Sequence, residues 1–195
     1  MTSPRALARL SSITSLRIVL VPVVMALILL GPRVRYAFVA AGVLFAVAAV
    51  TDFLDGYLAR RWGVTTTLGS FLDTTADKLV VSGALIALVA VDRASPWIAI
   101  IIIGRELVIL GLRGVVAADG TAFPPSVWGK MKANVQFLAV FLAILRYPRS
   151  LGSLYVDEWV MLAAAAITVI SGAEYLARFS SVFRSSSGPP DRRER

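Results

Sequence analysis

The chain has 195 residues, of which 57% are hydrophobic and 16% charged, and its mean hydropathy is +0.77. This composition excludes a disordered protein and argues against an ordinary soluble domain, where charged residues make up about 25%. Cysteine and histidine are both absent, so disulfides, zinc–thiolate sites and histidine-dependent triads are excluded, and any metal must be held by oxygen. The net charge of +8 on so apolar a chain favours anionic lipid and anionic substrates over nucleic acid as partners.

Six apolar segments predict an all-α integral membrane protein with six transmembrane helices in a single domain over residues 1–182. They cover approximately residues 17–31, 36–59, 69–91, 96–113, 132–147 and 156–178. Most have the roughly 17 to 25 residues that a helix needs to cross a bilayer, although the first and fifth are short. A soluble bundle would need polar outer faces on its helices, and Leu79–Val91 and Ala94–Gly104 have none.

The two ends of the chain are basic and predict different structures. Met1–Ser12 carries Arg5 and Arg9 among leucines and is interpreted as a short interfacial helix, with a frayed basic tail as the alternative. Residues 183–195 are rich in Ser, Pro and Arg and predict a disordered basic tail. Basic residues gather on the side of the membrane that holds both termini, which predicts that this side is cytoplasmic.

Four aspartates lie within 26 positions at the ends of the second and third predicted helices: Asp52, Asp55, Asp73 and Asp77. The first pair is three residues apart and the second pair four, so each pair shares one helix face. A carboxylate at bilayer depth costs at least about 2.5 kcal/mol, so four together require compensating cations. Two facing pairs would form an oxygen cage, and two divalent ions, Mg²⁺ or Mn²⁺, would balance its charge.

Small residues and an arginine lie between and beside the aspartates: Gly56, Ala59, Arg60 and Gly69. Glycine and alanine keep a helix face shallow enough for a ligand to approach, and the guanidinium fork of Arg60 suits a phosphate. The pattern therefore indicates a slot for a diphosphate beside the metal ions. Alternatively, Gly56, Ala59 and Gly69 only allow helices to pack closely, as small residues often do in membranes.

The segment from Asp52 to Asp77 reads D-x2-D-G-x2-A-R-x8-G-x3-D-x3-D and resembles the signature of the CDP-alcohol phosphatidyltransferase family. The resemblance implies a six-helix membrane enzyme, usually a homodimer, that breaks the diphosphate of a CDP-linked lipid. It also implies that the four aspartates surround two metal ions, that Asp77 is the general base, and that Gly56, Arg60 and Thr66 contact the CDP portion. Thr74 stands where the family usually has proline.

A second, basic cluster lies on or beside the fourth and fifth predicted helices: Arg105, Arg113, Lys130 and Lys132. Arg105 and Arg113 are eight residues apart, about two helical turns, so they point in similar directions. We interpret Arg105, Arg113 and Lys130 as a pocket for the phosphate of the acceptor. The alternative is an internal Arg105–Glu106 pair together with lysines that reach the membrane interface. This alternative is the expectation for Lys132, and it stays open for Arg113.

Several later motifs resemble the phosphatidylglycerophosphate synthase branch of the family: Arg105-Glu106, Gly129-Lys130-Met131-Lys132, Gln136 and Ser171–Tyr175. This resemblance implies transfer of a phosphatidyl group from CDP-diacylglycerol to sn-glycerol 3-phosphate, with release of CMP, by a multi-pass plasma-membrane protein whose active site faces the cytoplasm. Ser11 and Ala133 depart from the branch's usual Asn and Thr.

Three other functions remain open from the sequence. The same chemistry could use another acceptor, as in a cardiolipin synthase or a phosphatidylinositol-phosphate synthase, but a lipid acceptor would not need a strongly basic pocket. A divalent-cation transporter could use the same aspartates, although we find no convincing pair of broken helices. A non-catalytic membrane scaffold would leave the clustered carboxylates without a role.

Overall fold

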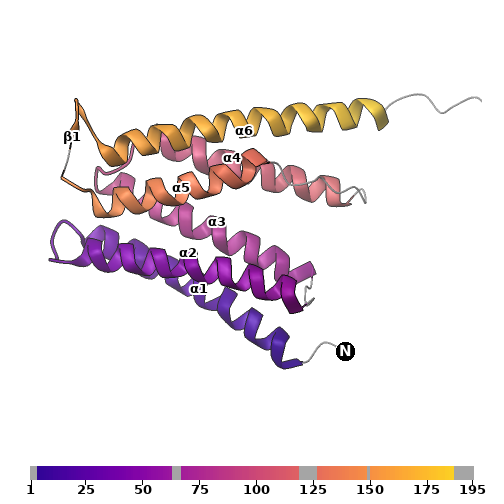
Figure 1. The fold of residues 1–195 in the computed structure, drawn as a ribbon, viewed down its shortest axis with the longest axis horizontal. Helices are drawn as coiled ribbons and strands as arrows, with labels where there is room; N and C mark the ends of the chain where they lie inside the picture. The colour runs from indigo at the N-terminus through magenta and orange to yellow at the C-terminus, as the bar shows by residue number, and fades with distance from the viewer. Residues whose placement is uncertain (1–3, 63–66, 119–126, 149, 187–195) are drawn as a thin grey trace, which may run out of the picture.

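A computed structural model describes the backbone over residues 4–62, 67–118, 127–148 and 150–186, and the side chains over 17–51, 75–117, 131–148 and 150–179. The described chain is a bundle of six long helices, shown in Figure 1. The helices are α1 (Pro4–Leu30), α2 (Ala37–Trp62), α3 (Thr67–Ala90), α4 (Pro96–Ala118), α5 (Val127–Leu145) and α6 (Val156–Ser186). Strands β1 (Ser150–Leu151) and β2 (Leu154–Tyr155) pair antiparallel before α6, and Gly152 supplies the positive φ of +73° in their turn.

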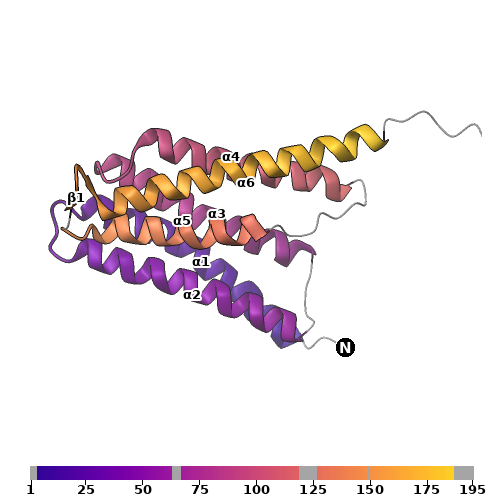
Figure 2. The same cartoon turned by 45° about the horizontal axis from the view of Figure 1, so that its top comes forward.

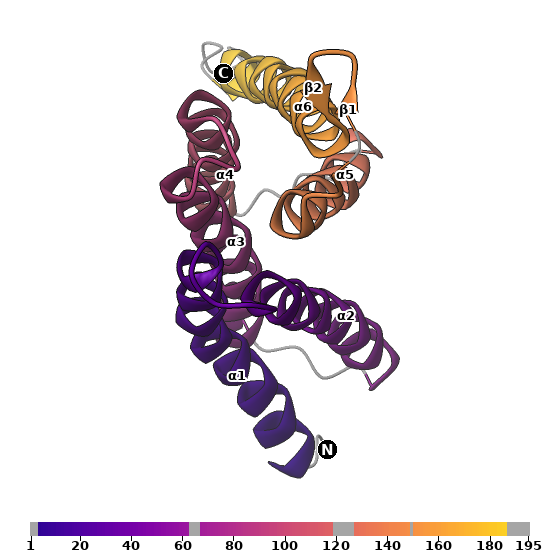
Figure 3. The ribbon, with the colours of Figure 1, turned by 90° about the vertical axis from the view of Figure 1, so that its left-hand side faces the viewer.

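The helices form a row with partners on one side. Viewed along the bundle, α1, α3 and α4 lie in the row, and α2 and the α5–α6 pair lie beside it (Figure 3). Helix α3 packs against α1 and α4, α5 packs against α6, and α2 reaches α5. The end of α2, the start of α3 and the end of α4 point to the same end of the bundle (Figures 1 and 2), here called the acidic end. The β-hairpin marks the opposite, hairpin end.

The predicted helices are confirmed in number and order within the described residues, but two boundaries differ. Helix α1 is continuous from Pro4 to Leu30, so the predicted interfacial helix at Met1–Ser12 is not a separate element. The reason is local: Pro4 suits the first helical turn, and Pro22 is the next proline or glycine along the chain. Helix α6 continues to Ser186, four residues into the segment 183–195 that was predicted to be disordered.

Apolar side chains cover the outside of the bundle as well as its core. Trp97 is 78% exposed and Leu107 61% exposed, whereas Glu106 and Lys132 are buried. The core itself is built largely from alanine, valine, leucine and isoleucine, and the rings of Phe45 and Phe137 lie 5.0 Å apart within it. An exterior this apolar would not be stable in water, and it is typical of helices that face lipid.

Among the described residues, Val156–Phe179 is the one helical segment that is both long and apolar enough to cross a bilayer. Shorter apolar helical stretches cover Arg17–Leu30, Ala37–Thr51 and Met131–Leu145. Helix α4 carries Arg105, Glu106 and Arg113 within its length, and ionisable side chains reduce the apolarity of a helix. The six crossings predicted from the sequence therefore remain a prediction.

The hairpin end is held together by two arginines and two carboxylates. Arg93 donates to the carbonyl of Ile144 at 2.6 Å and lies over the ring of Phe38, and burial together with the charge of Arg146 lowers its pKa. Arg146 contacts Asp157 at 3.3 Å and Glu158 at 3.5 Å. Both carboxylates lie in the first turn of α6, where the helix dipole stabilises negative charge. This network holds the end of α5 next to the start of α6.

Candidate active site

The predicted metal ligands lie on two helices that follow each other in the chain. Asp52 and Asp55 lie near the end of α2, and Asp73 and Asp77 near the start of α3, so the backbone brings both pairs to the acidic end. Of the four carboxylates, the structure describes the side chain of Asp77. The convergence of the four groups therefore stays a prediction.

Most of the predicted substrate contacts also fall outside the described side chains. These are Gly56, Ala59, Arg60, Thr66 and Gly69 for the CDP-lipid, and Lys130 for the acceptor phosphate. The structure describes Arg105 and Arg113, on α4.

Asp77 is half-buried on α3 and is surrounded by charged groups from several helices. Arg17 of α1, Glu106 of α4 and Lys132 of α5 all lie within electrostatic range of its carboxylate, as does the neighbouring Lys78. The predicted general base thus lies at a meeting point of helices that are far apart in the sequence. A group that must orient a substrate hydroxyl needs such fixed surroundings.

Three cationic side chains converge on the carboxylate of Glu106. Lys132 contacts Oε1, Arg105 Nη1 lies 3.3 Å from the same oxygen, and Lys78 Nζ lies 3.1 Å from Oε2. We call these four residues the Glu106 cluster. It joins α3, α4 and α5 in the interior of the bundle, and the side chain of Glu106 is only 7% exposed.

The expectation for Lys132 was wrong. Its side chain is 6% exposed and pairs with Glu106 instead of reaching the membrane interface. Helix α5 begins at Val127, so Lys132 lies in its second turn, where its ammonium contacts Glu106 of α4. The Arg105–Glu106 pair, considered in the sequence as an alternative to a phosphate pocket, is present.

Arg105 and Arg113 share a face of α4, as their spacing predicts, and this face meets α6. The Cγ of Arg105 lies so close to Gly172 that a Cβ built on the glycine would be 3.2 Å away. Arg113 lies over the ring of Tyr175, 5.7 Å from its centre, and its side chain is exposed. The two arginines therefore differ in surroundings, because Arg105 belongs to the buried cluster and Arg113 lies about two turns farther along the helix.

A polar seam between α5 and α6 continues from the cluster. Gln136, one turn after Lys132, donates to the hydroxyl of Thr168 at 2.8 Å. Thr168 donates to the carbonyl of Ala164, and Ser171 donates to the carbonyl of Thr168. Gln136, Thr168 and Ser171 are all buried. Within the sequence, Gln136 and Ser171 stood out only through their resemblance to the branch, and Thr168 gave no signal.

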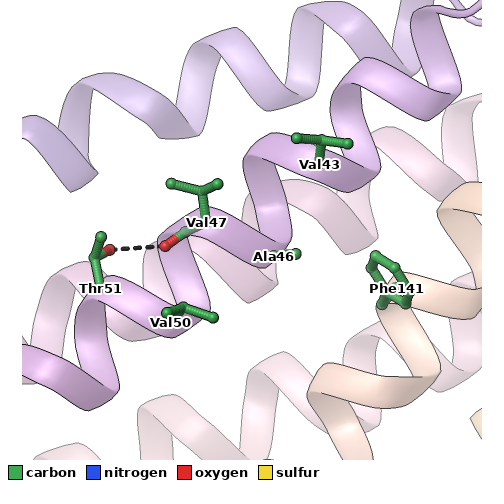
Figure 4. Close-up of a pocket in the computed structure, with 6 residues that line it drawn as sticks. All are labelled: Val43, Ala46, Val47, Val50, Thr51 and Phe141. Carbon is green, nitrogen blue, oxygen red and sulfur yellow. Dashed lines mark hydrogen bonds between the residues drawn. The ribbon is translucent and has the colours of Figure 1, made fainter.

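An apolar groove of about 340 Å³ lies between α2 and α5 (Figure 4). It is lined by Val43, Ala46, Val47, Val50, Thr51 and Phe141. The hydroxyl of Thr51 is turned back to donate to the carbonyl of Val47 at 2.9 Å, so this end of the groove carries no free donor from that side chain. Thr51, the last lining residue on α2, directly precedes Asp52, the first predicted metal ligand, in the sequence.

The chemistry of the available donors fits a hard divalent cation. The four aspartates offer carboxylate oxygen alone, and the sequence contains no histidine or cysteine that would favour zinc or copper. Within the described side chains no group of three candidate ligands occurs, and three of the four aspartates lie outside that part of the chain, so the metal site stays a prediction.

The chain matches the family model for CDP-alcohol phosphatidyltransferase over residues 10–170. It is 37% identical over 189 residues to the CDP-diacylglycerol--glycerol-3-phosphate 3-phosphatidyltransferase of Bacillus subtilis, covering 91% of this chain and 97% of that protein. The Pseudomonas fluorescens protein of the same name is 37% identical, covering 84% of this chain and 86% of its own length. A Mycobacterium tuberculosis protein named "Probable phosphatidylglycerophosphate synthase" is 42% identical, covering 88% of this chain and 82% of its own length. The chain therefore belongs to the CDP-alcohol phosphatidyltransferase family.

Proposed function

We propose that the protein transfers a phosphatidyl group from CDP-diacylglycerol to sn-glycerol 3-phosphate, giving phosphatidylglycerophosphate and CMP. The names of its relatives in Bacillus subtilis and Pseudomonas fluorescens support both substrates. The structural observation that carries the proposal is the Glu106 cluster, which gathers one buried and two partly buried cations near Asp77. Such a surplus of positive charge suits an acceptor that carries a phosphate, and a neutral alcohol would not need it.

In this proposal Asp77 is the general base. Its carboxylate takes the proton of a glycerol hydroxyl, the hydroxyl oxygen forms a bond to the β-phosphorus, and the bond from that phosphorus to the CMP oxygen breaks. The carboxylate can act only on a hydroxyl within hydrogen-bond reach, so the placement of the acceptor contributes much of the rate. Arg105, Arg113 and Lys130 are the proposed contacts to the acceptor phosphate.

The donor is proposed to bind across α2 and α3. Gly56, Ala59 and Gly69 give its diphosphate room, and Arg60 and Thr66 contact the CDP portion. The groove between α2 and α5 is apolar and reaches the residue before Asp52, which suits an acyl chain of the same lipid.

Members of this family generally depend on divalent metal ions. We assign Asp52, Asp55, Asp73 and Asp77 as ligands of two ions, Mg²⁺ or Mn²⁺, which would supply neutralisation of diphosphate charge when bound. We also propose a homodimer with six crossings, both termini in the cytoplasm and the acidic end facing the same side. The apolar exterior supports a location in the membrane.

The proposal is tested with purified protein in lipid–detergent micelles that contain CDP-diacylglycerol and Mg²⁺ or Mn²⁺. CMP release is followed with sn-glycerol 3-phosphate, phosphatidylglycerol or an inositol phosphate as acceptor. We expect rapid release with sn-glycerol 3-phosphate and none after chelation with EDTA, with recovery when the metal is restored. Release with one of the other acceptors alone would contradict the assignment, and metal flux into vesicles without CMP would favour a transporter.

A further inference from the structure

Glu106 divides its two oxygens among cations from different helices. Oε1 contacts Lys132 of α5 and Arg105 of α4, and Oε2 lies 3.1 Å from Nζ of Lys78 of α3. A single carboxylate therefore fixes the relative positions of three basic side chains. Lys78 is also the residue after Asp77, so the same carboxylate anchors α3 next to the proposed base.

The cluster holds more positive charge and more donors than Glu106 can satisfy. Three cations contact the Glu106 carboxylate, and Asp77 is a second carboxylate within electrostatic range, so the positive charges still outnumber the negative ones. Each ammonium has three N–H donors and the guanidinium has five. The Nε of Arg105 is buried and has no hydrogen-bond acceptor among the described residues. A buried donor without an acceptor is costly, and a phosphate offers several oxygens to such donors.

We propose that Glu106 is a positioning residue for the acceptor phosphate, and that it holds Lys78, Arg105 and Lys132 with their remaining donors turned to one phosphate monoester beside Asp77. The inference rests on the proposed function and adds Lys78 and Lys132 to the acceptor pocket. Without Glu106, three neighbouring like charges, one of them buried and two partly buried, repel one another and separate, and the pocket loses its shape. The Glu106 carboxylate thus favours binding of the acceptor by positioning the three cations, even though its own negative charge repels the acceptor phosphate.

A substitution at Gly172 of α6 is a second way to perturb the same pocket, and it changes no charge. An added Cβ would lie 3.2 Å from Cγ of Arg105 and 3.9 Å from its Nε, so Arg105 must shift by a few tenths of an ångström. Gly111 on α4 is the matched control, because a Cβ added there meets no atom within 4 Å.

The main test is Glu106→Gln, which keeps the shape of the side chain and removes its charge. We expect the KM for sn-glycerol 3-phosphate to rise about 10- to 100-fold, the range for loss of charge-assisted contacts, while the KM for CDP-diacylglycerol changes less than about twofold. Glu106→Asp, which restores the charge on a shorter stem, should recover part of the loss. Glu158→Gln at the hairpin end is the matched control and should leave both KM values unchanged.

Gly172→Ala should raise the KM for sn-glycerol 3-phosphate severalfold, and Gly111→Ala should not. A parallel rise of both KM values in Glu106→Gln, or a lower melting temperature with both KM values unchanged, would show a merely structural role and overturn the inference. If Glu106→Gln does not fold, Gly172→Ala decides, since an unchanged acceptor KM there also overturns it. Failure of the proposed function is a separate result: the unaltered protein would then release no CMP with sn-glycerol 3-phosphate.

Discussion

The hairpin end and the Glu106 cluster both contain buried ionic contacts, but they differ in charge balance. At the hairpin end, Arg93 and Arg146 are matched by Asp157 and Glu158, and spare guanidinium donors go to main-chain carbonyls. In the Glu106 cluster, three cations share one carboxylate. A balanced network holds helices together, whereas a partly buried surplus of one sign suits a ligand of the other sign. The two networks should therefore respond differently to mutation.

The largest expected effect is that of Asp77→Asn. An amide cannot take the proton of the acceptor hydroxyl, so turnover should fall by about 10²- to 10⁴-fold. CMP release measures the loss, and a melting curve in the same detergent should show that the variant still folds. Substantial activity in the folded variant would remove Asp77 from the role of base.

The next largest effect is expected for Arg105→Ala, which removes a cation from the surplus. The KM for sn-glycerol 3-phosphate should rise about 10-fold or more, because a charge-assisted contact is lost in a largely shielded setting. Arg113→Ala should have a smaller effect, since Arg113 is exposed and lies outside the Glu106 cluster. Initial rates over a range of acceptor concentrations measure both. Unchanged KM and turnover in Arg105→Ala would mean that Arg105 pairs with Glu106 but does not contact the acceptor.

The smallest effect on catalysis is expected at the hairpin end. Arg146→Gln leaves the buried Asp157 without its ion-pair contact, so the free energy of unfolding should fall by about 1–2 kcal/mol. The KM for sn-glycerol 3-phosphate should stay the same. Thermal unfolding and initial rates on the same preparation test this contrast. A changed acceptor KM would mean that the balanced network also contributes to the site.

The sequence predicts the helices well because long apolar segments leave a protein in lipid few alternatives to the helix. It predicts their ends less well. Helix α1 begins at Pro4 and α6 continues to Ser186, beyond the apolar segments, because main-chain hydrogen bonding continues until a residue or contact stops it. The short hairpin at residues 150–155 was not predicted, because two-residue strands leave no periodic pattern.

The candidate site also has one part that the sequence predicts and one part that it does not. The aspartate pattern is local, so spacing along the helices is enough to group Asp73 with Asp77. The Glu106 cluster is not local: Lys132 is 26 residues after Glu106 and belongs to another helix. A single sequence carries no signal for such a pairing, and for this reason Lys132 was expected at the membrane interface.

The order of the cluster along the chain has a consequence for biogenesis. Lys78 precedes Glu106, and Lys132 follows it by 26 residues. If the helices of the nascent chain enter the bilayer in order, Glu106 arrives when Lys78 is already available to neutralise it, and the later arrival of Lys132 then completes the pairing. Because Lys78 and Arg105 both precede Lys132 in the chain, Glu106 would have two cations beside it before the last pairing forms.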